Sequence, residues 1–415
     1  MSVVSGDNSG GGGENKTKPG SVNGGLTIIA ALLSMVGPFT IDTYLPSFPD
    51  IEIDFGVNRA VLSQSLGVYL AAVAITTLFW GPLSDRIGRR VVILTSMFLY
   101  IIASIGCAMA DNIDAFLFMR VMQGLAVSGS FTASRAMIRD VHDAQSAHRA
   151  MSQVMLMFAI APAIAPILGA WLHDMFGWRS VFWFLAIFGA SLMVMVFFIG
   201  ETLLREHRQS FKPTSVAAVY FRMFKNKHFM FLVVSLSSTF GGLFVYIAGA
   251  PTVIYDFLGL GSDGFAYMFI PMVGGVMMGS VISGRLTHKT SSSKIASIGF
   301  WVLTAAVTIN ILQAEFISPT MISVVGSLVA YAFGLALVMP AISVMALDCF
   351  PHNRGSAAAV QGFLQTLSIA AVSSLAVPLL SEKLIFFAGG QGMLLALSIA
   401  LWFYVGKASR LSSVK

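Results

Sequence analysis

Twelve apolar runs, each of about 20 residues, restrict what this 415-residue chain can fold into. A run of that length crosses the hydrocarbon core of a bilayer as an α-helix. Charged residues make up only 11% of the chain, against about 25% in an ordinary soluble domain. A soluble core could not bury so many helices that are apolar on every side, and a membrane barrel would show short alternating segments instead. The sequence therefore predicts an all-α membrane protein with spans over residues 26–46, 60–82, 91–110, 114–138, 150–172, 179–200, 227–250, 264–285, 294–313, 319–346, 355–379 and 384–405.

The basic residues predict the orientation of these spans. If the N-terminus is cytoplasmic and the spans alternate, 21 of the 25 Lys and Arg residues fall on the cytoplasmic side, whereas only Arg59, Arg179 and Lys383 fall on the outer side. Cytoplasmic loops of membrane proteins carry such an excess of positive charge. We therefore expect both termini in the cytoplasm, and we interpret the basic balance as topology rather than nucleic-acid binding.

The longest polar connection, residues 201–226, divides the spans into two sets of six. This plan suits two rigid bundles that rock about a site near the midplane of the membrane. The expected domains are a disordered cytoplasmic tail (1–25), an N-terminal six-helix bundle (26–200), a cytoplasmic central loop (201–226), a C-terminal six-helix bundle (227–406) and a short cytoplasmic tail (407–415).

The loop after the second predicted span carries the most specific motif, Gly-Pro-Leu-Ser-Asp-Arg-Ile-Gly-Arg-Arg over residues 81–90, which we call the loop signature. Gly81 is expected to permit close helix contact, and Gly88 a tight turn. Asp85 can accept hydrogen bonds from helix N-terminal amides or from Arg side chains. The basic residues of the signature are expected to face the cytosol and anionic lipid; they are Arg86, Arg89 and Arg90.

The loop signature resembles that of the major facilitator superfamily (MFS). The resemblance implies that Asp85 and an Arg latch the two halves of the protein in the outward-facing state, together with an acid at the inner end of span four. Asp140 stands at a suitable position for that acid. The alternative is a basic loop that only fixes topology.

Two charged residues fall inside predicted spans. Asp42 in span one lies roughly 6 Å from the outer end, and Arg120 in span four roughly 9 Å from the same end, at about 1.5 Å per residue. We therefore expect them to meet at similar depth. Burial favours a neutral carboxyl group, whereas a nearby Arg favours the carboxylate, so such a site can hold and release a proton. Two alternatives are a static ion pair and a position of Asp42 at the outer headgroups.

Segments along nearly the whole chain resemble drug/proton antiporters of the bicyclomycin and chloramphenicol resistance (Bcr/CflA) branch. They are Asp42-Thr43-Tyr44-Leu45-Pro46-x-x-Pro49, Arg120-x-x-Gln123-Gly124, the stretch 246–251 with Phe265, and Gly-Ser-Ala-Ala-Ala over 355–359. The resemblance implies that Asp42 and Arg120 are the proton-coupling residues and that the protein lies in a bacterial inner membrane.

Span five carries two prolines four residues apart, Pro162 and Pro166, followed by Gly169. Such prolines leave carbonyl groups unpaired and bend a helix, and small residues allow close packing with a neighbouring span. The segment resembles the antiporter motif of exporters, although alanines stand where that motif often has glycines. An ordinary proline kink is the alternative.

Cavity residues are harder to predict, because most of the 23 Met and 33 Phe residues are expected to face lipid or other helices. The seven His residues do not show metal-ligand spacing, and the chain has no phosphate-binding loop. We therefore expect that the protein is not an enzyme and that it binds no metal and no cofactor. Its expected energy source is a proton gradient. The candidate substrate-binding residues are Tyr44, Tyr69, Gln123, Phe240, Tyr246 and Gln361.

These patterns favour a monomeric proton-coupled antiporter that exports drug-like small molecules by alternating access. One alternative is an exporter of a specific metabolite, such as a purine, a sugar or an amino acid. An alternative of another class is a membrane sensor that does not transport.

Overall fold

The computed structural model describes residues 19–203, 206, 208, 213–287 and 289–412. Within that part of the chain the first half contains α1 (Pro19–Asp42), η1 (Leu45–Ser47), α2 (Phe48–Phe55), α3 (Arg59–Ile87), α4 (Arg89–Ala108), α5 (Ile113–Val141), α6 (Ala144–Phe176) and α7 (Arg179–Phe197). The second half contains α8 (Pro213–Lys225), α9 (Lys227–Ala248), η3 (Thr252–Phe257), α10 (Gly264–Thr287), α11 (Ser292–Phe316), α12 (Met321–Asp348), η4 (Pro351–Asn353), α13 (Arg354–Ala371), η5 (Val372–Ala376), α14 (Val377–Leu380) and α15 (Leu384–Ser412).

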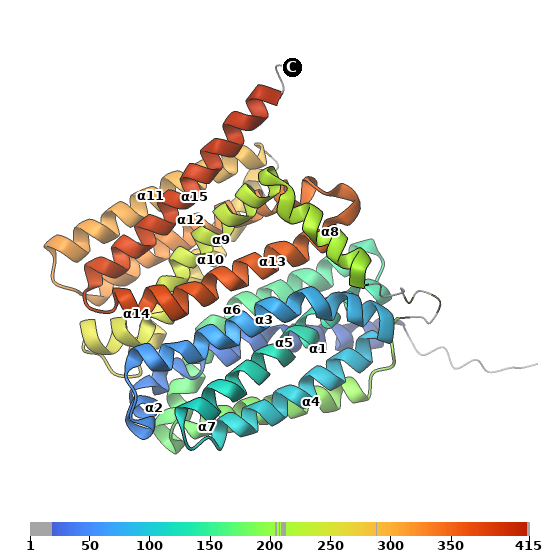
Figure 1. The fold of residues 1–415 in the computed structure, drawn as a ribbon, viewed down its shortest axis with the longest axis horizontal. Coiled ribbons are helices and arrows are strands. Elements are labelled where there is room, and N and C mark those ends of the chain that lie inside the picture. The colour runs from blue at the N-terminus through green and yellow to red at the C-terminus, as the bar shows by residue number, and fades with distance from the viewer. Residues whose placement is uncertain (1–18, 204–205, 207, 209–212, 288, 413–415) are drawn as a thin grey trace, which may run out of the picture.

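The long helices form two bundles of six, as predicted (Figure 1). In the N-terminal bundle α5 packs against α3 and α4, while α1 packs against α6. In the C-terminal bundle α12 packs against α10 and α11, while α9 packs against α15. The bundles meet chiefly along α3 with α13 and along α6 with α10. We call the end where α1 begins and α15 ends the terminal end, and the opposite end, which holds α2 and α14, the distal end (Figure 1).

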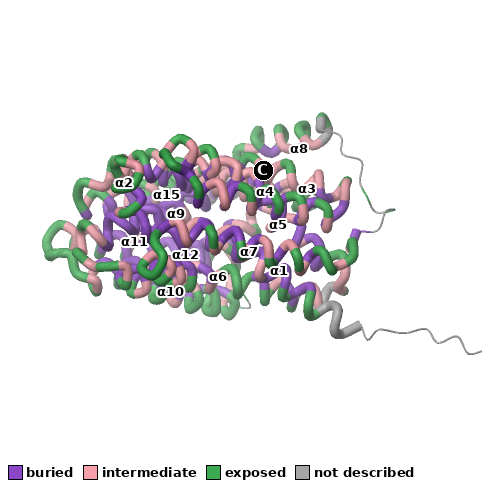
Figure 2. The backbone as a smooth tube through the Cα atoms, turned by 90° about the horizontal axis from the view of Figure 1, so that it is seen from below, coloured by how far each residue is buried: buried purple, intermediate pink, exposed green. Residues whose placement is uncertain are grey.

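Eleven of the helical segments are long and apolar enough to cross a membrane. The remaining long helix, α5, corresponds to predicted span four and is more polar because it carries Arg120, Arg135 and Arg139. Figure 2 shows buried residues along the helix faces that turn inward and exposed residues on the outer faces. Many of those exposed residues are large and apolar, such as Trp301, Ile322 and Phe403. An apolar exterior of this kind fits a lipid environment.

Asparagine side chains fix where several helices begin. The Oδ1 atoms of Asn58, Asn112 and Asn226 each accept a hydrogen bond from the amide three residues later, at 3.0, 2.9 and 3.0 Å. Such caps satisfy one of the amides that the first helical turn leaves unpaired. The short connections between spans are therefore defined by local chemistry.

Two predicted boundaries differ from the structure. Helix α1 begins at Pro19 rather than at residue 26, since proline suits the first turn of a helix; the rest of the predicted tail, residues 1–18, lies outside the described residues. The central loop is not only a loop, because it contains α8. The prediction missed this helix because its continuous apolar run, residues 216–221, is far shorter than the roughly 20 residues of a membrane span.

Candidate functional site

Asp42 is the last residue of α1 and is buried inside the N-terminal bundle. The chain turns at Thr43 and Tyr44 and then continues outward as η1 and α2. Asp42 is only 3% exposed, and its Oδ1 atom has no hydrogen-bond partner. The carboxyl group therefore does not lie exposed on the surface, as a position among outer headgroups would require.

Arg120 of α5 is completely buried in the same bundle. Its Nη1 donates to Gln123 Oε1 at 2.7 Å and to the Thr40 carbonyl at 3.3 Å, and its Nε donates to the Ser65 carbonyl at 3.4 Å. Its Nη2 has no partner. Neutral oxygens from three helices thus hold the guanidinium, and one donor is left free.

Two tyrosine rings lie against the Arg120 guanidinium. Its Cζ is 4.5 Å from the ring centroid of Tyr44 and 4.5 Å from that of Tyr69. Aromatic faces stabilise a desolvated cation at such distances. The Tyr44 hydroxyl is 3.1 Å from Ser65 Oγ, whereas the Tyr69 hydroxyl is buried without a partner.

No ion pair joins Asp42 and Arg120, although both residues are fully described. The two charges, which we expected to meet at similar depth, therefore do not form an ion pair in this structure. The guanidinium is instead held by the Thr40 carbonyl, two residues before Asp42. The bundle core consequently contains an acid and a base that both retain unpaired polar atoms.

The other predicted substrate-binding residues divide between the bundles. Gln123 bridges Arg120 to Ser104 Oγ, to which its Nε2 donates at 2.8 Å. Phe240 of α9 is half-buried near Phe244. The structure brings Tyr44, Tyr69 and Gln123 together around Arg120 but leaves Phe240 in the other bundle.

Tyr246 and Gln361 lie in polar contacts of the C-terminal bundle. The Tyr246 hydroxyl accepts a hydrogen bond from Asn310 Nδ2 at 2.7 Å. Gln361 of α13 is half-buried, and its Nε2 donates to Ser343 Oγ at 2.9 Å. Both side chains are therefore engaged within their own bundle.

Span five corresponds to α6, which contains Pro162 and Pro166 within one continuous helix. Gly169 faces the end of α1, where an added Cβ would overlap the Thr43 carbonyl. A glycine is required at this contact because no side chain fits. The predicted close packing of small residues thus occurs next to Asp42.

In the loop signature, Gly88 has φ 111°, which confirms the predicted turn. Arg89 does not face the cytosol as expected: it is only 7% exposed, because it lies between two acids. Its Nη1 is 2.5 Å from Asp85 Oδ1, and its Nε is 3.1 Å from Asp140 Oδ2. Arg86 is exposed. Gly81 is not a close-contact position, since an added Cβ would make an ordinary 3.6 Å contact with Thr132.

Glu201 is a residue of this region that the sequence did not reveal as a partner. Its carboxylate accepts from the amides of Arg89 at 2.9 Å and Arg90 at 3.2 Å, so it caps the N-terminus of α4 from beyond α7. In the sequence, Glu201 is recognisable only as a charged residue at the end of a helix. Its capping role is not evident, because α4 lies more than 100 positions away.

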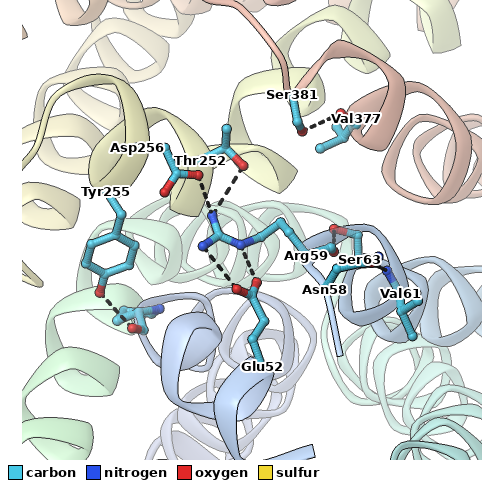
Figure 3. Close-up of polar contacts among 11 residues, drawn as sticks. Glu52, Asn58, Arg59, Val61, Ser63, Thr252, Tyr255, Asp256, Val377 and Ser381 are labelled. Atoms are coloured by element: carbon cyan, nitrogen blue, oxygen red, sulfur yellow. Dashed lines mark hydrogen bonds and ion pairs between the residues drawn. The ribbon is translucent and has the colours of Figure 1, made fainter. Parts of the chain in front are cut away.

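At the distal end, Arg59 of α3 joins the two bundles (Figure 3). Its Nε and Nη2 bind the carboxylate of Glu52 in the N-terminal bundle. Its Nη1 reaches η3 of the other half, at 3.1 Å from Asp256 Oδ2 and 3.3 Å from Thr252 Oγ1. We call these four residues the Arg59 cluster.

Further polar contacts hold the distal ends of the bundles together. The Tyr255 hydroxyl donates to the Pro46 carbonyl at 2.7 Å (Figure 3). Gln64 Nε2 donates to the Ser374 carbonyl at 2.8 Å, and Ser262 Oγ donates to Asp174 at 2.9 Å. All these bonds link one bundle to the other, so the distal side is closed.

Two helical bundles in a membrane, with ionisable side chains buried in one of them, define a multi-pass transport protein rather than an enzyme. Among the described residues no group of His, Cys, Asp and Glu could hold a metal ion. Residues 28–373 match the Major Facilitator Superfamily. The chain belongs to this family of transporters.

Similar proteins support a particular branch of the family. The chain is 31% identical over 357 residues to an uncharacterized MFS-type transporter, YdgK, of Bacillus subtilis (84% of this chain, 88% of the relative). It is 28% identical over 284 residues to a bicyclomycin resistance protein homolog of Haemophilus influenzae (66% of this chain, 71% of the relative). The predicted relation to the Bcr/CflA branch is thereby confirmed.

A solved structure confirms the fold. The chain superposes on a D-xylose–proton symporter with a TM-score of 0.71 and 17% sequence identity, covering 93% of this chain and 97% of the other. At that identity the similarity concerns the fold alone.

Proposed function

We propose that this protein is a proton-coupled antiporter that exports drug-like small molecules from a bacterial cytoplasm. The observation that carries the proposal is the pair of buried, incompletely bonded groups, Asp42 and Arg120. Buried polar atoms are nearly always paired, and ionisable residues inside membranes are usually functional. A buried carboxyl group without a basic partner is more stable in its neutral form, so it retains a proton.

The proposed cycle uses exchange of partners at this site. When Arg120 turns from the Thr40 and Ser65 carbonyls toward Asp42, the carboxylate is stabilised and the proton leaves. When Arg120 returns between Tyr44 and Tyr69, Asp42 takes up a proton again. Neutralising the acid matters because moving one unpaired charge through the membrane field costs about 2.3 kcal/mol per 100 mV.

The bundle contacts support alternating access. The Arg59 cluster and the Tyr255–Pro46 bond close the distal side, which the charge distribution assigns to the periplasm. On the terminal side the buried Arg89 pairs with Asp85 and Asp140 inside one bundle. In the proposed outward-facing state the loop signature engages the C-terminal bundle while the Arg59 cluster separates.

Several finer features belong to the same proposal. The protein works as a monomer in the bacterial inner membrane with both termini cytoplasmic, and it uses a proton gradient and no cofactor. Its cargo is lipophilic or cationic, because Asp42 is the one acid that the described residues place in this core, where it can attract a cation. The proposed cargo contacts are Tyr44, Tyr69, Gln123, Phe240, Tyr246 and Gln361.

Asp42→Asn tests the proposal directly. In proteoliposomes, gradient-driven efflux and substrate-induced proton flux should fall to the level of protein-free vesicles, whereas substrate binding to the purified variant remains. Asp348→Asn is the matched control, because that acid is exposed at the terminal end. Unaltered efflux by Asp42→Asn refutes the proposal. A panel of antibiotics, dyes and metabolites in expressing cells separates a drug exporter from an exporter of one metabolite.

A further inference from the structure

A hollow between α4 and α7 lies on the outer surface of the N-terminal bundle, at its terminal end. Leu94 and Phe98 of α4 line it on one side, and Met193, Val194 and Phe197 of α7 on the other. Phe98, Val194 and Phe197 are more than half exposed, so the hollow opens outward rather than toward the other bundle. Its walls are almost entirely apolar, which suits a hydrocarbon chain.

Arg90, the first-turn residue of α4, lies at the rim of this hollow. Its Nη2 donates to the Phe197 carbonyl at 2.6 Å, and its Cζ is 5.2 Å from the Phe197 ring. Its Nε is buried and has no hydrogen-bond partner. The guanidinium is thus held in place by α7 while one of its donors remains unused, although an unpaired buried donor is costly.

The distances along α4 match the shape of a phospholipid. At about 1.5 Å per residue, Leu94 lies roughly 6 Å and Phe98 roughly 12 Å from Arg90 along the helix axis. The cation therefore stands at the membrane surface, and the apolar hollow begins about one turn deeper. A phosphate group and the first part of an acyl chain have the same order and spacing.

The charges around the rim favour an anion. The carboxylate of Glu201 is already bonded to the amides of Arg89 and Arg90, while Asp85 and Asp140 are paired with Arg89. A second guanidinium, that of Arg208, lies beside Gly88, where its Nη2 would be 3.1 Å from an added Cβ. Two cations against one carboxylate leave the rim with a net positive charge, and arginine donors bind phosphate oxygens well.

The C-terminal bundle offers a natural comparison. A similar hollow between α11 and α15 is lined by Thr304, Val307, Thr308, Gly392, Met393 and Ala396, among others, and its lining contains no charged residue. The lining of the α4–α7 hollow is uncharged as well, so what distinguishes it is the Arg90 guanidinium bonded at its rim.

From these observations we propose that the α4–α7 hollow is a binding site for one anionic phospholipid, with its phosphate on Arg90 and one acyl chain along Leu94 and Phe98. The site does not depend on the proposed proton-coupling pair, because none of the printed contacts of Arg90 or of the lining residues reaches Asp42 or Arg120.

Native mass spectrometry of the full-length protein in detergent tests the site, with phosphatidylglycerol and phosphatidylcholine of identical chains as the two probes. We expect wild-type protein to retain one phosphatidylglycerol in preference to phosphatidylcholine. Arg90→Gln should weaken phosphatidylglycerol binding about fivefold, which corresponds to roughly 1 kcal/mol for one basic residue at an anionic membrane surface. Arg86→Gln, which removes an exposed charge nearby, should leave it unchanged.

A second pair of variants tests the hollow itself. Val194→Trp fills the α4–α7 hollow and should abolish the preference, whereas Met393→Trp fills the α11–α15 hollow and should preserve it. Equal retention of the two lipids by wild-type protein overturns the proposal. So does an equal loss with Arg86→Gln and Arg90→Gln, since that result would mean a diffuse surface charge. If Arg90→Gln cannot be purified, the tryptophan pair alone decides.

Discussion

The polar cores of the two bundles differ in which buried groups are unpaired: neutral Ser237 and Gln313 in the C-terminal bundle, but ionisable Asp42 and Arg120 in the N-terminal bundle. In the C-terminal bundle Asn310 donates to Tyr246 and to Gln391 Oε1, at 2.7 and 2.9 Å, and accepts from Ser327 Oγ at 3.1 Å. Gln391 in turn donates to the Gly242 carbonyl at 3.2 Å. This network joins four helices, and each amide in it has partners for both its oxygen and its nitrogen.

In the N-terminal bundle, Asp42, Tyr69 and Arg120 each retain a buried atom without a partner. A fully bonded buried network makes a core rigid, whereas an incompletely bonded one has alternative arrangements of similar energy. The comparison teaches that one bundle provides a fixed frame and the other the groups that can change state. Each of the following predictions tests that difference.

The largest contrast is expected between Arg120→Gln and Asn310→Leu. The first should reduce gradient-driven efflux to background, because no cation remains to stabilise the ionised acid. The second leaves the Tyr246 hydroxyl and Gln391 Oε1 without this partner, while Ser327 Oγ can still donate to the Ser323 and Val324 carbonyls. It should lower the free energy of unfolding by about 1–3 kcal/mol. Proton flux per substrate, measured in proteoliposomes, should stay normal for Asn310→Leu. If both variants uncouple protons from substrate, the division between the bundles is wrong.

Gly169→Ala should disturb the end of α1 that carries Asp42. Overpacking of this kind costs about 1–3 kcal/mol, because the new Cβ overlaps the Thr43 carbonyl. Gly274→Ala in α10 is the control, since a Cβ there meets nothing within 4 Å. Thermal unfolding in detergent, followed with efflux, should show a loss for Gly169→Ala alone; equal behaviour of the two variants would contradict the assigned contact.

A pair of tyrosine variants compares a bonded hydroxyl with an unbonded one. The Tyr331 hydroxyl donates to the Thr239 carbonyl at 2.8 Å, so Tyr331→Phe should lower the free energy of unfolding by about 1 kcal/mol. Tyr69→Phe removes a hydroxyl without a partner and should leave stability unchanged or slightly higher. Denaturant or thermal unfolding measures both, and a larger loss with Tyr69→Phe would show that its hydroxyl is bonded in the native protein.

The smallest effect is expected where the bundles meet. Asp256→Asn removes the ion pair with Arg59, and exposed pairs contribute only about 0–1 kcal/mol. That free energy shifts an open–closed equilibrium by at most about fivefold. Distances between labels on the two distal ends should show more open molecules, whereas Asp348→Asn, whose ion pair with Arg354 lies within one half, should not change them.

Much of the fold could be predicted from local features of the sequence. Long apolar runs require helices in a bilayer, which is why the spans were found, and Gly88 marked a turn that only glycine adopts easily. The burial of Arg89 and the capping role of Glu201 could not be predicted, because both depend on residues that are far apart in the sequence. The helix α8 was missed because its apolar run is too short to cross a membrane.

The sequence by itself determined that Asp42 and Arg120 lie within the membrane, since flanking apolar residues carry them there whatever the packing. Only the tertiary structure decided that they form no ion pair, with Arg120 against Tyr44 and Tyr69 and bonded to neutral oxygens. The physical reason is that depth follows from position along one helix. Pairing depends on how several helices are rotated against one another, and no single segment of the chain encodes that.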